Sequence, residues 1–168
     1  FVNGSASVVL DNTYKEYLFT FKNIHTNADQ VDLTFNGSDD TSSHSYDITK
    51  TTSFFESFHN EGDTSAEVGY LAGADLAQST AVQPLGSGLG NANDENLGGY
   101  LHLFNPSGTT FVKHFISKIN QSYRVGLPGS INQFVAGYFN TTAAITAIQF
   151  KMESGNIDAG DICLYGIK

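Results

Sequence analysis

The strongest fold signal in the sequence is Leu101-His-Leu-Phe-Asn-Pro-Ser-Gly-Thr-Thr-Phe-Val-Lys-His-Phe-Ile-Ser117. Two short runs of apolar and aromatic residues flank a polar turn containing Pro106 and Gly108, a pattern that predicts a β-hairpin. Because side chains alternate between the two faces of a strand, these runs place apolar groups on both faces in either pairing register. We therefore expect the hairpin to lie at the centre of a sheet, with the rest of the chain wrapped around it.

The composition of the chain is typical of an all-β protein. Its 168 residues include 17 Gly, 13 Phe and 8 Tyr, and 40% of them are hydrophobic. Aromatic residues suit a pleated surface, whereas glycine and asparagine make chain reversals. A chain of this length can bury a core without disulfides or metals, so we expect one domain over residues 1–168.

Alternating apolar and polar residues predict the other strands. In residues 14–24, Tyr17, Phe19 and Phe21 fall on one face, and the same period of two in residues 31–35 ends at the turn signal Asn36-Gly37. Strands are also expected at residues 8–10, 46–58, 66–71, 123–127, 134–140, 145–152 and 162–167. Many short strands separated by turns, without a convincing helix, predict a jelly-roll-like antiparallel β-sandwich.

Residues 72–99 lose the alternation and mix glycines with small and polar residues, so we expect a long loop there. Long loops in small domains are often functional, which makes this segment a candidate for contact with a partner. It contains Gly86-Ser-Gly-Leu-Gly90, which lacks the lysine and the flanking pattern of a phosphate-binding loop and is interpreted as a flexible loop.

Charge and cysteine content exclude several classes of function. A net charge of −9 with only eight Lys and Arg argues against nucleic-acid binding, which depends on basic side chains. No apolar run approaches the roughly 20 residues that span a bilayer. The chain has one cysteine, Cys163, so it cannot form an internal disulfide, and this favours intracellular assembly. Cys163 is expected to be a small buried hydrophobic residue. The chain starts at Phe1, which suggests processing or a piece of a longer protein.

Few residues carry a pattern that points to chemistry. His102 and His114 lie on the paired strands of the hairpin, and one register places them on the same face whereas a shift by one residue separates them. The acidic segments 91–96 and 156–161 supply the oxygen ligands that Ca²⁺ prefers, yet Asn, Asp and Gly are also ordinary turn formers. We assign no catalytic, cofactor-binding or metal-binding residue, and we expect no cofactor and no enzyme activity.

Several segments, taken in order along nearly the whole chain, resemble a family of uncharacterised bacteriophage proteins abundant in marine viral sequences. The resemblance implies a structural protein of the virion, of the tail-fibre, spike or head-decoration type, and carries no catalytic or ligand-binding residues. The segments are Tyr14-Lys-Glu-Tyr-Leu-Phe-Thr-Phe-Lys-Asn-Ile-His25, Phe54-Phe-Glu-Ser-Phe-His-Asn-Glu-Gly62, Leu101-His-Leu-Phe-Asn-Pro106, Phe111-Val-Lys-His-Phe115, Gly137-Tyr-Phe-Asn-Thr-Thr142, Ser154-Gly-Asn-Ile-Asp-Ala-Gly160 and Leu164-Tyr-Gly-Ile167.

These observations predict a non-enzymatic virion protein that assembles as a homo-oligomer, with a trimer as one option. Its expected partners are other copies, other virion proteins and a glycan of the host surface, with no nucleic acid and no membrane. A carbohydrate-binding module, Ca²⁺-dependent or not, is the alternative. A polysaccharide-degrading enzyme would need two carboxylates across a cleft, and the spacing of Asp and Glu selects no such pair.

Overall fold

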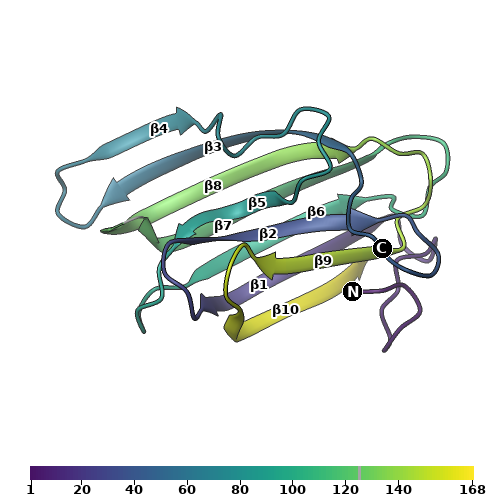
Figure 1. The fold of residues 1–168 in the computed structure, drawn as a ribbon, viewed down its shortest axis with the longest axis horizontal. Coiled ribbons are helices and arrows are strands. Elements are labelled where there is room, and N and C mark those ends of the chain that lie inside the picture. The colour runs from purple at the N-terminus through teal and green to yellow at the C-terminus, as the bar shows by residue number, and fades with distance from the viewer. Residues whose placement is uncertain (125) are drawn as a thin grey trace.

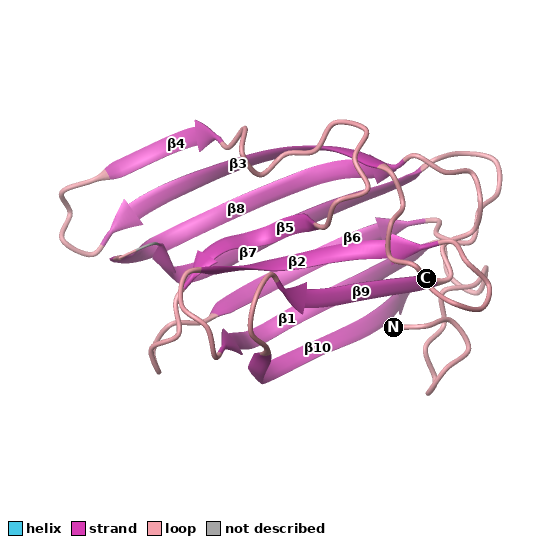
Figure 2. Cartoon of the chain, viewed as in Figure 1, coloured by secondary structure: helices cyan, strands magenta, loops and turns pink. Residues whose placement is uncertain are grey.

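The computed structural model describes residues 1–124 and 126–168, and these form an antiparallel β-sandwich of two sheets (Figure 1). The larger sheet has seven strands in the order β10-β1-β6-β7-β8-β3-β4, and the smaller has three in the order β5-β2-β9. Figure 2 shows strands and loops throughout. The strands are β1 (Glu16–Thr26), β2 (Val31–Ser38), β3 (Lys50–Asn60), β4 (Ala66–Tyr70), β5 (Gln83–Leu89), β6 (Leu97–Phe104), β7 (Lys113–Arg124), β8 (Leu127–Phe139), β9 (Ala147–Met152) and β10 (Ile157–Ile167).

The all-β class and the sandwich expected from the sequence are confirmed, whereas the finer jelly-roll topology stays a prediction. Within the described part of the chain, no helix is long and apolar enough to cross a membrane.

The hairpin of β6 and β7 lies at the centre of the larger sheet, as predicted. β7 is the fourth of the seven strands, and it pairs with β6 on one side and β8 on the other. The inward side chains Leu101, Leu103 and Phe115 are fully buried. The expectation that the rest of the chain wraps around the hairpin holds for one face only. β5, β2 and β9 lie over that face in Figure 1, and Ile116 on the other face is 48% exposed.

The hydrophobic core between the sheets is built from phenylalanines of both layers. Phe35 of β2 packs edge-on against Phe115 of β7, with ring centroids 4.8 Å apart, and against Phe139 of β8 at 5.8 Å. Phe150 of β9 likewise contacts Phe19 and Phe21 of β1, each at 5.1 Å. The period of two predicted for β1 therefore selects the correct core face.

The segment predicted as a long loop at residues 72–99 contains a strand. β5 covers residues 83–89, including most of the predicted glycine loop, and β6 begins at Leu97. Glutamines of the larger sheet hold β5 in place, because Gln133 accepts a hydrogen bond from the Ser87 amide at 2.8 Å and Gln121 donates to the Ser87 carbonyl at 2.8 Å. The glycine at 86 allows this approach, since a Cβ there would lie 3.0 Å from Leu97.

Two further local predictions are wrong. Residues 8–10 form no strand, because the Val8 amide bonds back to the Ser5 carbonyl at 2.9 Å in a tight turn. The Asn36-Gly37 turn is also absent: β2 continues to Ser38, and Asn36 donates to the Thr80 carbonyl at 3.0 Å.

The predicted boundaries differ near the C-terminal half as well. The short strand expected at 123–127 spans the end of β7 and the start of β8, and it includes Val125, which lies outside the described residues. The acidic segment 156–161 lies mostly on β10 rather than in a turn. Cys163 is half-buried rather than buried, since it lies opposite Thr20 on the outward face of β10.

Candidate functional site

The face of the larger sheet turned away from β5, β2 and β9 is the largest candidate site, and we call it the outer face. Seven of the nine large hydrophobic side chains that are exposed among the described residues lie on it. Soluble proteins rarely leave so many on one surface unless it binds something. The seven residues are Phe55, Val68, Tyr70, Tyr100, Ile116, Tyr165 and Ile167.

The middle of the outer face carries a row of large side chains, which we call the aromatic row. Strand pairing places its members directly opposite one another on five adjacent strands: Tyr100, Lys118, Phe134, Phe55 and Tyr70. The rings of Phe55 and Phe134 are stacked, with centroids 4.8 Å apart and an angle of 8° between their planes. The ammonium of Lys118 lies 5.4 Å from the centroid of Phe134, a cation–π contact.

Next to the aromatic row lies a shallow groove of about 540 Å³, which we call the small-residue groove. Its floor includes Ile116, Ala136 and Ser53, which face one another across β7, β8 and β3, two residues along each strand from the aromatic row. His114 and Tyr138 line its other side, with ring centroids 5.9 Å apart. A ridge and a hollow therefore run side by side across three strands.

The two hairpin histidines share the outer face but are not paired with each other. His102 lies opposite Ile116, and its ring packs against Phe104 at 4.3 Å. Its Nε2 atom is 3.1 Å from a carboxylate oxygen of Glu16 on β1. His114 instead contacts Tyr138. The register thus settles the alternative that the sequence left open.

The central strands of the outer face carry little charge, although the chain carries −9 overall. At the outward positions of residues 51–59, 98–104, 114–120 and 130–138, Lys118 is the one Lys, Arg, Asp or Glu side chain. Glu16 lies on the outward face of the neighbouring strand β1, where it contacts His102, and Asp161 lies outward on the edge strand β10. The remaining acidic side chains lie on loops, on β2, β4 and β10, and at the inner face. Another body can therefore approach β3, β6, β7 and β8 without meeting an acidic side chain on these strands.

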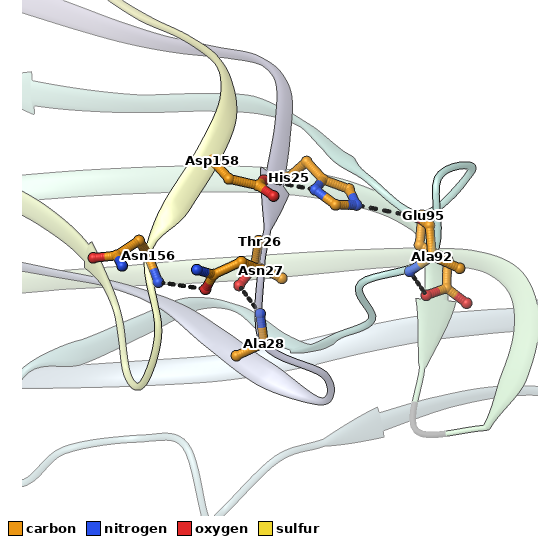
Figure 3. Close-up of polar contacts among 8 residues, drawn as sticks. All are labelled: His25, Thr26, Asn27, Ala28, Ala92, Glu95, Asn156 and Asp158. Carbon is orange, nitrogen blue, oxygen red and sulfur yellow. Dashed lines mark hydrogen bonds and ion pairs between the residues drawn. The ribbon is translucent and has the colours of Figure 1, made fainter.

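A second candidate site lies at one end of the sandwich, where His25 joins the two acidic segments (Figure 3). Its Nδ1 atom is 2.6 Å from Asp158 Oδ1 on β10, and its Nε2 atom is 3.1 Å from the carbonyl of Ala92. Glu95 closes the loop of Ala92 by accepting a hydrogen bond from its amide at 2.9 Å. Segments 91–96 and 156–161 are therefore brought together, a proximity that sequence alone did not reveal.

Both ring nitrogens of His25 face acceptors, so only the protonated imidazolium can donate to both. The hydrogen bond to Asp158 raises the pKa of His25, partial burial opposes the shift, and the Ala92 carbonyl supports it. The described residues contain no group of three or more His, Cys, Asp or Glu side chains placed to hold a metal ion. We call this arrangement the clasp: His25 links Asp158 on β10 to the loop at Ala92.

The clasp predicts a pH-dependent stability. The pKa of His25 is raised in the folded state above its unfolded value of about 6.5, so its contribution is fully present below about pH 6.5 and is lost as the pH rises through the folded value. Thermal melts of the wild type and Asp158→Asn should differ most at about pH 5–6 and converge toward about pH 9.

The matched control is Asp63→Asn, which removes the partner of His59 in an exposed pair 3.0 Å apart. It should change the melting temperature little at any pH, because exposed ion pairs contribute little. A difference between wild type and Asp158→Asn that stays constant over this pH range would contradict the clasp.

No protein-family model, no curated protein and no solved structure matches this chain.

Proposed function

We propose that this chain is a non-enzymatic structural protein of a bacteriophage virion, of the tail-fibre, spike or head-decoration type, that assembles through its outer face. The observation that carries the proposal is the concentration of exposed large hydrophobic side chains on that face, seven of nine. A structural protein uses such a surface for lasting contact with its neighbours. The resemblance described for the sequence supplies the viral setting.

Electrostatics supports the same function. The acidic groups of the chain keep it soluble before assembly, since a net charge far from zero prevents random association. The central strands β3, β6, β7 and β8 of the outer face carry no acidic outward side chain, so contact there reduces the repulsion. A single charged group at its centre, Lys118, is held against the ring of Phe134.

The test is whether the chain is part of the particle. Intact, purified particles of the virus that encodes it are labelled with gold-conjugated antibodies raised against residues 1–168. Labelling at the head shell or along the tail is the expected result, and its position distinguishes decoration from fibre. Recovery of the chain only from the soluble fraction of infected cells, with unlabelled particles, would overturn the proposal.

Carbohydrate binding is a second candidate, favoured by a polar region beside the aromatic row. Asn120 donates to Ser130 at 3.0 Å and lies 3.4 Å from Asn132, and these side chains border open depressions of about 420 and 520 Å³ near His59. Amide and hydroxyl groups of this kind bind sugar hydroxyls.

A glycan array probed with and without Ca²⁺ tests this candidate. Saturable binding that is lost in Asn132→Ala and kept in Asn140→Ala, an exposed asparagine in the loop after β8, would support carbohydrate binding at the outer face. Dependence on Ca²⁺ would direct attention to the acidic segments instead. An array without saturable binding would reject this candidate.

A further inference from the structure

We propose that the partner of the outer face is a second copy of this chain, bound face to face about a two-fold axis so that the aromatic row of each copy fills the small-residue groove of the other. This inference rests on the proposed function, since it names the neighbour that the outer face contacts.

The arrangement follows from the order of the rows. The aromatic row and the groove are adjacent, about 6.8 Å apart along the strands. Consider a two-fold axis that lies in the interface, parallel to the two rows and midway between them. This axis places the aromatic row of one copy against the small-residue groove of the other. Phe55 then faces Ser53 of the other copy and Phe134 faces Ala136, so large side chains meet small ones on β3 and β8. On β7 the alkyl chain of Lys118 faces Ile116. Such an isologous contact closes on itself.

The area available matches what a stable dimer needs. Seven strands about 4.8 Å apart and four rows of outward residues about 6.8 Å apart give the outer face an area of roughly 600–900 Å². Two copies would bury roughly 1,200–1,800 Å² in total, within the range of specific protein–protein interfaces.

Charge and ring geometry favour a protein over a sugar at the aromatic row. Two copies that each carry −9 can approach here because the central strands hold no acidic outward side chain. A sugar packs on the flat face of an aromatic ring, but Phe55 covers one face of Phe134 at 4.8 Å and the Lys118 ammonium lies over the ring at 5.4 Å. The row therefore resembles a ridge that fills a groove more than a platform for a sugar.

Sedimentation equilibrium over about 1–100 µM tests the proposal. The wild type should form a species of twice the 18.1 kDa of one chain. Phe55→Asp removes the ridge and Ser53→Trp fills the groove, and each should weaken dimerisation about 30-fold or more. Two matched controls should dimerise as the wild type does. Phe111→Asp changes a residue that is 75% exposed in the β6–β7 loop, and Ser42→Trp changes a serine in an exposed loop.

Three results would overturn the proposal: a monomer over the whole range, a trimer, or equal dimerisation of Phe55→Asp and Phe111→Asp. Near-ultraviolet circular dichroism verifies that each variant is folded. If Phe55→Asp does not fold, Ser53→Trp still tests the interface. If the chain is monomeric in solution but the antibodies label the particles, only this inference is overturned. A dimer that is absent from the particles would overturn only the viral function.

Discussion

Replacing Phe115 with alanine is expected to lower the free energy of unfolding by about 3–5 kcal/mol, the usual loss for a large aromatic side chain in a packed core. Phe115 is fully buried on the central strand β7, and its ring contacts Phe35 of the opposite sheet at 4.8 Å and Phe139 at 5.2 Å. Its removal leaves a cavity between the two sheets that the surrounding strands cannot close.

Urea unfolding at several protein concentrations measures this effect and separates it from assembly. Phe111→Ala is the matched control, because it deletes the same side chain where it is 75% exposed, and it should change the free energy of unfolding by less than about 0.5 kcal/mol. An unchanged unfolding midpoint for Phe115→Ala would show that the hairpin is not the centre of the core.

Gly99→Ala is expected to destabilise the fold by roughly 3 kcal/mol or more, the upper range for inserting atoms into a packed site. A Cβ at this position on β6 would lie 2.2 Å from the carbonyl oxygen of Lys118 and 2.9 Å from the Cα of Ile119 on β7. Both atoms belong to the backbone of the neighbouring strand, so relief requires the central strand pair to separate. We expect the β6–β7 hairpin to lose its register near this point.

The neighbouring glycine provides the control. A Cβ at Gly98 would meet only the Phe21 carbonyl oxygen within 4 Å, at 3.6 Å, which is an ordinary contact. Gly98→Ala should therefore change the free energy of unfolding by less than about 1 kcal/mol. If both variants unfold at the same urea concentration, the close approach of β6 and β7 is not a determinant of stability.

The parts of the fold that the sequence predicts well are those with one apolar face. In β1, Tyr17, Phe19 and Phe21 alternate with less buried residues, and the structure buries these three. β5 could not be found in this way, because its Pro84, Gly86 and Ser87 lack the alternation and its position depends on glutamines of β7 and β8.

The candidate site likewise has features that the sequence predicts and features that only the folded chain defines. Apolar residues on both faces of the hairpin are visible in the sequence, but periodicity cannot tell whether the second face is covered by the same chain or left for a partner. The alignment of Phe55 with Phe134 depends on the register of β3 with β8, two strands far apart in sequence. The clasp of His25 with Asp158 likewise depends on contacts that only the folded chain defines.

The outer face is expected to be covered by another copy in solution, and hydroxyl-radical footprinting measures this coverage. As the protein concentration rises from about 1 to 100 µM, oxidation of Phe55 and Tyr100 should fall severalfold while oxidation of Phe111 stays constant. Phe55 and Phe111 are 45% and 75% exposed in the single chain, so both react when the chain is alone. If the oxidation of Phe55 stays constant over this concentration range, as that of Phe111 does, the outer face is not covered by a second copy.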